Sequence, residues 1–241
     1  MCKKNMEELL KVIDRFYSGD RTCVYEKARC LSGDGKEIQV SPIEGSERAG
    51  RTFARVDCIS DRLAYVLVEG RTVEGYRSEV LGLIKSAGKW QIMAMLKADT
   101  PYWFHNLYRS FDESQKDIDL IYGLLMRYCH DVYLMDAPDC LGLFWDDCRM
   151  YHPNQDDSFT DVEIQVLHER WRNMPDPQEL GIKEFSRIYH VELLDENTAV
   201  AKLGCAKLNN YFFDYHFLIK VNGEWKMANK MTQGLHTGDL V

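Results

Sequence analysis

The sequence predicts an α+β fold made of two tandem units, each with helices followed by an antiparallel sheet. The first observation behind this is an internal repeat, in which residues 56–92 align without gaps with residues 191–227, an offset of 135 positions. The second is the order of patterns in each copy. Helical periodicity comes first, and short β-rich runs bounded by turn residues come after it.

Both copies of the repeat contain the segment L-I-K-x-x-G-x-W. It runs from Leu83 to Trp90 in the first copy and from Leu218 to Trp225 in the second. Further identical pairs are Val56/Val191, Ala64/Ala199 and Tyr76/Tyr211. Two unrelated meanders with similar turns are the alternative, but an ungapped match of this length favours duplication.

Helices are predicted ahead of each sheet. Asn5 can cap a first helix, whose apolar face carries Met6, Leu9, Leu10, Ile13, Phe16 and Tyr17. Ser114 and Asp117 form a capping-box pattern before a second helix, along which Ile118, Ile121, Tyr122, Leu125, Cys129 and Val132 recur. Thr160 and Glu163 form another such pattern before a helix that Pro175 and Pro177 end, and a short helix is expected near 138–144.

Strands are predicted in the second copy near 184–194, 198–208, 211–221 and 224–232. The segment Val221-Asn222-Gly223-Glu224 is the clearest hairpin turn of the chain. The strand at 211–221 is apolar or aromatic on both alternating faces. Because a strand of this kind is usually covered on both faces, one face is expected to pack on helices and the other on a partner sheet.

These elements divide the chain into three segments. A reduced first unit spans 1–98, an aromatic junction spans 99–112, and a fuller second unit spans 113–241. The first unit is shorter by about one helix, so it is expected to hold a smaller cavity than the second, or none. The junction is rich in aromatic residues and poor in Gly and Ser, so it is expected to pack across both units.

Composition excludes several classes of protein. The chain has 30 basic and 38 acidic residues, a net charge of −8, which disfavours binding to nucleic acid. No apolar run approaches the ~20 residues of a membrane span, and no apolar segment follows the first residues as in a secretory signal. The expectation is a cytoplasmic protein with neither nucleic acid nor membrane as a partner.

The eight cysteines show no C-x-x-C spacing, so they are expected to be free, mostly buried thiols. Cys140, Cys148 and His152 match no zinc spacing, and no metal site is predicted. The chain also contains no phosphate-binding or dinucleotide-binding glycine motif, and no cofactor is predicted.

The second copy resembles a known family. The run Phe212-x-Asp214-Tyr215, followed by the segment from Leu218 to Lys230, is similar to the putative lumazine-binding branch of the nuclear transport factor 2-like superfamily. The segment 139–147 resembles that superfamily's second helix, and the first copy joins the resemblance through the repeat. The resemblance implies a bent sheet wrapped around helices as a cone, with a pocket at its open end. It also implies pairing through the outer sheet face, here as an intramolecular pseudo-dimer, with homo-oligomers possible.

The resemblance places Asp214 and His216 on the face that lines the cone, where they are candidates for general acid–base chemistry. Tyr122 and Tyr128 lie on the preceding helix, and Tyr122 fits its core-facing stripe better, so it is the third catalytic candidate. The residues expected to line the pocket are Trp145, Trp171, Tyr189, Met227, Asn229 and Met231. Core packing is the competing interpretation for each of them.

The leading function hypothesis is binding of a small apolar or aromatic molecule in the second unit. One alternative is a cofactor-independent lyase or isomerase of the ketosteroid isomerase or polyketide cyclase type. The other is a non-catalytic interaction module whose cones are filled by side chains. The fold hosts many activities, so the site has to decide among them.

Overall fold

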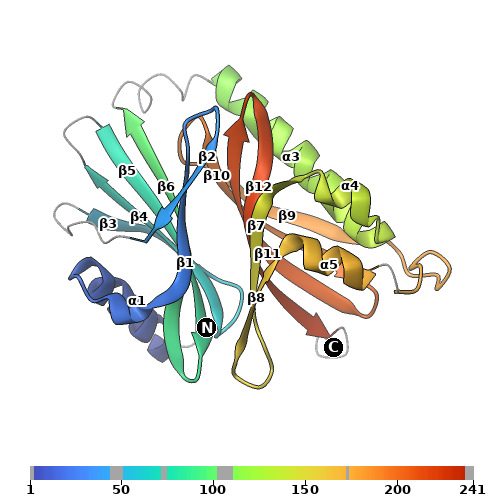
Figure 1. Cartoon of the computed structure of the whole chain (residues 1–241), viewed down its shortest axis with the longest axis horizontal. Helices are drawn as coiled ribbons and strands as arrows, with labels where there is room; N and C mark the ends of the chain where they lie inside the picture. The colour runs from blue at the N-terminus through green and yellow to red at the C-terminus, as the bar shows by residue number, and fades with distance from the viewer. Residues whose placement is uncertain (1–2, 44–50, 72–74, 102–110, 172–173, 237–241) are drawn as a thin grey trace.

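The computed structural model describes residues 3–43, 51–71, 75–101, 111–171 and 174–236. Two six-stranded sheets, one from each half of the chain, meet in the middle of the molecule (Figure 1). The α+β class and the two tandem units predicted from the sequence are confirmed.

The first unit opens with helix α1 (Lys3–Tyr17) and a short 3-10 helix, η1 (Arg21–Cys23). Its strands are β1 (Val24–Gly33), β2 (Ile38–Pro42), β3 (Arg51–Cys58), β4 (Leu63–Arg71), β5 (Gly75–Ser86) and β6 (Lys89–Pro101). Strand β6 thus extends three residues past the unit boundary expected at 98. Residues 102–110 of the expected junction lie outside the described residues.

The second unit contains helices α3 (Phe111–Leu134), α4 (Ala137–Leu141) and α5 (Ile164–Trp171). Its strands are β7 (Phe144–Pro153), β8 (Phe159–Glu163), β9 (Ser186–Leu193), β10 (Thr198–Lys207), β11 (Asn210–Val221) and β12 (Glu224–His236). The four predicted strands correspond to β9–β12, within a few residues at each end.

The two sheets share one topology. Their strand orders are β2-β1-β6-β5-β4-β3 and β8-β7-β12-β11-β10-β9, and in each the first strand of the unit runs parallel to the last. The pairing irregularity between Gly82 and Leu83 recurs between Phe217 and Leu218. Their hairpin turns match as well, with positive φ at Ala87 and Gly88 and again at Asn222 and Gly223, as a type I′ turn requires. The repeat seen in the sequence is therefore a repeat of structure.

The outer faces of the sheets pack against each other. One cluster of buried side chains draws on both units, and in it Tyr65 of β4 meets Tyr215 of β11 edge to face, with ring centroids 4.9 Å apart. The Tyr215 hydroxyl donates to Asp57 of the first unit over 2.5 Å. The sheets approach so closely that a Cβ on Gly82 would lie 2.1 Å from Sδ of Met231. The doubly apolar β11 is thus covered on both faces, as its sequence predicts.

The helices cover the opposite faces (Figure 1), α1 on the first sheet and α3–α5 on the second. The lysine of the repeated L-I-K segment ties each helix to its own sheet. Lys85 Nζ lies 2.8 Å from Glu8 Oε2, and Lys220 Nζ lies 2.8 Å from Asp117 Oδ2. Asp117 also accepts a hydrogen bond of 2.9 Å from the Trp225 indole, so one carboxylate holds two repeat residues.

Three helix starts predicted from capping patterns are wrong. Helix α1 already includes Lys3, so Asn5 lies inside it and accepts from Lys85 instead. Helix α3 begins at Phe111, which puts Ser114 inside the helix and leaves Asp117 free to bind Lys220. Thr160 lies in strand β8, and α5 starts only at Ile164. In each case a side chain that can cap a helix makes a tertiary or strand contact instead.

The short helix predicted near 138–144 is confirmed as α4, but it ends at Leu141 and β7 follows from Phe144, so the second helix that the resemblance implies for 139–147 does not extend through that segment. The first unit has a hairpin, β1 and β2, where the second has β7 and β8. Among the described residues the first unit has no counterpart of α4, and residues 44–50, where a counterpart of α5 would be expected, lie outside the described residues. The predicted difference in cavity size stays a prediction, because part of the first unit lies outside the described residues.

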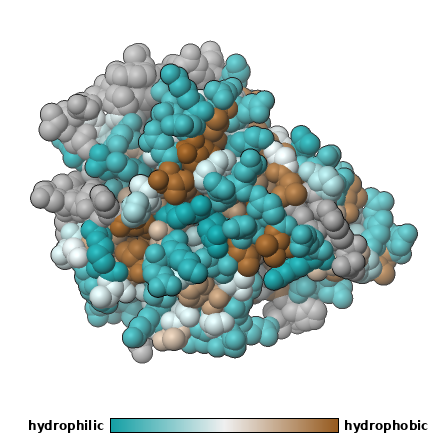
Figure 2. All heavy atoms as spheres, in the orientation of Figure 1, coloured by the Kyte–Doolittle hydropathy of each residue, from teal (hydrophilic) through white to brown (hydrophobic). Residues whose placement is uncertain are grey.

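All seven described cysteines are free, and six of them are buried. On the face drawn in Figure 2 hydrophilic residues predominate, and hydrophobic ones form small separate patches. Within the described ranges, no helix has both the length and the apolar character needed to cross a membrane.

Candidate functional site

A cavity of about 530 Å³ opens between the helices and the sheet of the second unit. Its lining comes from α3, β7, α5, β10, β11, β12 and the loops between them. Aromatic and methionine side chains, Trp171, Phe212, Met150 and Met174, form much of its walls. Its polar and charged side chains include Tyr128, His152, Arg170, Lys207, Lys230 and Thr232.

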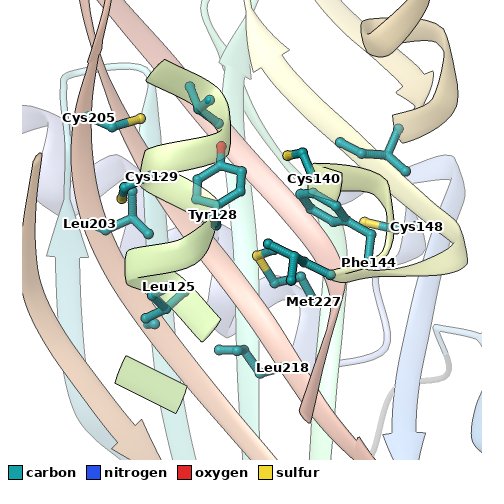
Figure 3. Close-up of a cluster of buried hydrophobic side chains, with 14 of the residues drawn as sticks. Leu125, Tyr128, Cys129, Cys140, Phe144, Cys148, Leu203, Cys205, Leu218 and Met227 are labelled. Carbon is teal, nitrogen blue, oxygen red and sulfur yellow. The ribbon is translucent and has the colours of Figure 1, made fainter. Parts of the chain in front are cut away.

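Helix α3 places Tyr128 over the sheet. Its buried residues follow helical spacing and are Ile121, Leu125, Tyr128, Cys129 and Val132. Figure 3 shows the Tyr128 ring within this core, with its hydroxyl directed away from Leu125 and Leu218. The apolar packing therefore fixes the ring and leaves only the hydroxyl to find a polar partner.

Strands β11 and β12 supply that partner. Asp214 stands opposite Thr232, and His216 stands opposite Lys230 in the antiparallel register. Since side chains alternate along a strand, these four share the face turned toward α3. Tyr215, Phe217 and Met231 occupy the other face and pack against the first unit.

Tyr128, Asp214 and Lys230 form a buried network. The Tyr128 hydroxyl donates to Asp214 Oδ2 over 2.7 Å, and Lys230 Nζ lies 3.0 Å from the same oxygen. Lys230 also donates to the Tyr128 hydroxyl over 2.5 Å. Asp214 is fully buried and Lys230 is 6% exposed, so each charge depends on the other for compensation.

The network fixes the protonation of its members. Burial alone would raise the pKa of Asp214, but the Lys230 ammonium and then His216 overcome it and hold the pKa well below its usual range. Burial alone would lower the pKa of Lys230, but the Asp214 carboxylate raises it above the ordinary value. Burial, and after it the Asp214 charge, raise the pKa of Tyr128 well above its usual value. At neutral pH the site therefore holds a carboxylate, an ammonium and a neutral phenol.

His216 completes the polar layer behind the cavity. Its Nε2 lies 3.6 Å from Asp214 Oδ2, beyond hydrogen-bond distance, and its ring packs edge to face on Tyr128 with centroids 4.9 Å apart. Burial lowers its pKa more than Asp214 raises it, so the ring is neutral at pH 7. His216 thus acts as packing beneath Tyr128 and as a weak dipole beside the carboxylate.

The structure separates this layer from the cavity. Tyr128, Lys230 and Thr232 line the cavity, whereas Asp214 and His216 are not among its lining residues and are both fully buried. The predicted acid–base pair does share one face with the core of the cone. It lies behind Tyr128 and Lys230, which are the groups that a bound molecule would meet, so Asp214 is a positioning residue for them.

Lys207, the last residue of β10, adds a second lysine to the lining. Its Nζ lies 4.2 Å from the centre of the Trp171 ring, a cation–π geometry. Burial, and after it the charge of Lys230, lower the pKa of Lys207 to about 7. This amine therefore changes its charge near neutral pH.

His152 of β7 and Arg170 of α5 lie on the wall of the cavity. The Nδ1 atom of His152 lies 3.2 Å from the carbonyl oxygen of Pro153, which favours the tautomer that leaves Nε2 as an acceptor. Burial chiefly, and the Arg170 charge in a smaller part, lower the pKa of His152. The cavity thus contains a neutral imidazole as well as cationic groups.

The predicted lining residues divide into three groups. Trp171 lines the cavity, and Met227 belongs to the same core behind it. Trp145 and Met231 were predicted to line it but pack in the cluster between the two sheets. Asn229 is buried beside β7 without lining the cavity, and Tyr189 is 41% exposed and contacts Phe213.

The prediction for Tyr122 is wrong, because this residue is 40% exposed on the outer side of α3. One residue of an α-helix turns by ~100°, so only one of Ile121 and Tyr122 can face the sheet. Ile121 does, and Tyr128, seven residues further, follows it. That seven-residue spacing was the signal in the sequence that identifies Tyr128.

Lys207, Lys230 and His152 were not predicted as site residues. Lys230 is the one charged residue of the segment from Met227 to Met231, and this was a usable signal. The irregular pairing around Asn229 hides which face each residue takes, because a single bulge reverses the alternation. The sequence around Lys207 and around His152 contains no pattern that identifies either residue as part of a site.

The first unit keeps part of this arrangement. The Tyr17 hydroxyl of α1 donates to Glu79 Oε2 over 2.6 Å, and Glu79 occupies the repeat position of Asp214. The repeat positions of His216 and Lys230 are Leu81 and Met95, both buried and apolar. The tyrosine–carboxylate pair is therefore common to both units, and the buried lysine belongs to the second alone.

One family model and several solved structures are similar to part of the chain. Residues 116–233 match the model of a family described as "Putative lumazine-binding". A nuclear transport factor 2-like protein of unknown function from Shewanella baltica is 20% identical, with a TM-score of 0.45, and the match covers 50% of this chain and 94% of that one. Another from Silicibacter pomeroyi is 13% identical, with a TM-score of 0.46, over 51% and 98%.

A ketosteroid isomerase-like protein from Erwinia carotovora is 14% identical, with a TM-score of 0.38, over 48% of this chain and 95% of that one. No curated protein matches the chain. Likeness at this level carries no information about activity. Over residues 116–233, within its second unit, the chain is thus similar to the family described as putative lumazine-binding.

Proposed function

We propose that the second unit binds a small, flat aromatic molecule in its cavity. The observation that carries this proposal is the cavity itself, about 530 Å³ in volume and walled by Trp171, Phe212, Met150 and Met174. Ligand sites typically measure about 300–1,000 Å³ and combine apolar walls with a few polar groups. An interaction module with filled cones would leave no such space.

The polar groups of the cavity suit the same kind of ligand. Asp214 accepts the hydrogen bond of Tyr128 and pairs with Lys230, so a bound molecule meets one phenol oxygen and one ammonium in fixed positions. The matched family is described as lumazine-binding, and lumazine is a flat heteroaromatic ring with carbonyl oxygens. Such oxygens would accept from the third N–H of Lys230, which neither Asp214 nor Tyr128 uses, while the ring lies against the aromatic wall.

The test is a binding screen with a variant that narrows the cavity. Met174 lines the cavity and is 40% exposed, so Met174→Trp obstructs it without touching the core. Leu180→Trp makes a comparable change at a site that is 56% exposed and does not line the cavity. Thermal shift with lumazine and other flat aromatics finds ligands, because binding to the folded state raises the apparent stability. Calorimetry then gives each Kd.

We expect Met174→Trp to weaken binding about tenfold or more and Leu180→Trp to leave it unchanged. Equal affinities in both variants would place the binding elsewhere on the protein. A screen in which no aromatic compound binds the wild-type chain would contradict the proposed function.

A cofactor-independent isomerase or lyase is the second candidate. The observation that favours it is the rigid Tyr128–Lys230 pair on the lining, facing a cavity that also holds the neutral imidazole of His152. The Lys230 ammonium would stabilise an enolate oxygen, and His152 would remove the proton from the adjacent carbon. Asp214 then orients the pair instead of acting on the substrate.

This candidate has a direct assay. Aromatic ketones are incubated with the protein in D₂O, and the loss of the α-proton signal is followed by NMR. If the protein catalyses the exchange, His152→Gln should slow it by ~10²-fold or more, the scale of general base catalysis. Exchange at the uncatalysed rate with every ketone that binds would leave binding as the sole function of the cavity.

A further inference from the structure

The charge of the cavity is opposite to that of the chain. The protein carries a net charge of −8, yet the described residues that line the cavity include Lys207, Lys230 and Arg170 and no Asp or Glu. The carboxylate of Asp214, behind the lining, is already shared by Lys230 and Tyr128. The positive charge of the wall is therefore not balanced from within the lining.

Lys207 is the lysine that carries this excess charge. Lys230 has Asp214 at 3.0 Å, but no acidic side chain of the described residues forms an ion pair with Lys207. Its ammonium lies on the face of Trp171, 4.2 Å from the ring centre, where it is stabilised without being neutralised. A partly buried ammonium with an aromatic ring beside it is a ready site for an anion.

We propose that the ligand of this cavity is an aromatic acid, whose anionic group pairs with Lys207 while its ring lies against the aromatic and methionine wall. The inference rests on the proposed function and narrows its ligand class. Arg170, on the same helix as Trp171, supplies a second cation to the wall. A neutral aromatic amide of the same shape would leave the Lys207 ammonium without a counter-charge, and so would bind less tightly.

The test compares acid and amide pairs that differ in charge and hardly in shape. The probes are benzoate and benzamide, 2-naphthoate and 2-naphthamide, and quinaldate and quinaldamide. Calorimetry at pH 6.5 gives the Kd of each compound for the wild-type chain, for Lys207→Met and for Lys183→Met. Lys183 is exposed and does not line the cavity, so its variant makes the same change in net charge away from the site.

For at least one pair we expect the acid to bind wild type about tenfold or more tightly than the amide. Lys207→Met should remove this preference by weakening the acid about tenfold, while the amide changes by less than about twofold. Lys183→Met should keep the preference. These outcomes together would identify Lys207 as the residue that selects for an anion.

Two other outcomes are distinguishable. If amides and acids bind wild type equally well, or if Lys207→Met keeps the preference, the anion inference fails while the proposed binding function stands. If none of the six compounds and no lumazine binds the wild-type chain, the proposed function fails with it.

Discussion

The substitution Asp214→Asn probes the buried network most sharply. Asparagine keeps the shape of the side chain and still accepts from Tyr128, but it removes the negative charge that compensates Lys230. Lys230 is only 6% exposed, so in the variant it must either stay charged without a counter-ion or lose its proton. The cost of the substitution is the smaller of these two free energies.

Loss of the Lys230 proton sets an upper limit on the cost of the substitution, and this limit depends on pH. Deprotonating a lysine with an ordinary pKa of about 10.4 at pH 7 spans about 3.4 pH units at about 1.4 kcal/mol each, or about 4–5 kcal/mol. At pH 9 the same step costs about 2 kcal/mol. Loss of one partner from a buried ion pair typically costs about 3–5 kcal/mol, so the two estimates agree at neutral pH.

Urea unfolding, followed by circular dichroism, measures the free energy of unfolding of wild type and variant at pH 7 and pH 9. We expect Asp214→Asn to lower the free energy of unfolding by about 3–5 kcal/mol at pH 7 and by about 2 kcal/mol at pH 9. The double variant Asp214→Asn with Lys230→Met, which removes both charges, should recover most of the loss. A loss below about 1 kcal/mol that is equal at both pH values would refute the view that this pair is a mutually dependent buried ion pair.

Three further predictions follow from burial and packing. The unfolded chain binds more protons than the folded one between pH 7 and about 10.4, because the pKa of Lys207 is lowered to about 7. Lys207→Met should therefore raise the free energy of unfolding by ~1–3 kcal/mol at pH 6, and this increase should disappear by pH 10. Urea unfolding at both pH values measures it. Gly82→Ala should lower that free energy by ~1–3 kcal/mol, since its Cβ would lie 2.1 Å from Met231 Sδ, and additivity with Met231→Ala in a double-mutant cycle would contradict this contact. All eight thiols should react with a thiol reagent in denaturant without reductant, and fewer than eight reactive thiols would mean a disulfide. In the folded chain most thiols should react slowly, because burial hinders access and, at Cys58, raises the pKa to about 11.

Short-range patterns account for the elements that were predicted well. The turn Asn222-Gly223 and the alternation of β11 depend on backbone preferences and on solvent exclusion over a few residues, and both appear in the sequence directly. The shared L-I-K-x-x-G-x-W segment revealed the tandem units because both copies keep the same hairpin and the same lysine anchor. The packing of sheet on sheet followed from the apolar residues on both faces of β11.

Capping patterns failed where a polar side chain had a better partner far along the chain. Asp117 resembled a helix cap, but its carboxylate holds Lys220 and Trp225, more than 100 residues away. Trp145 resembled part of a helix that lines the pocket, but it lies on β7 and faces the first unit. Local sequence offers each such side chain several partners, and only the fold decides among them.

The sequence by itself determined the fold class, the duplication and the face on which Asp214 and His216 lie. The fold class and the duplication depend on periodicity and on identity at a fixed offset, and the face of Asp214 and His216 on the resemblance to a known family. Only the tertiary structure decided that Asp214 lies behind Tyr128 and Lys230, and that Lys207 comes to the same cavity from the end of β10. The physical reason is that a buried charge is tolerable only next to its counter-charge, and the pairing of distant strands and helices sets which charges meet.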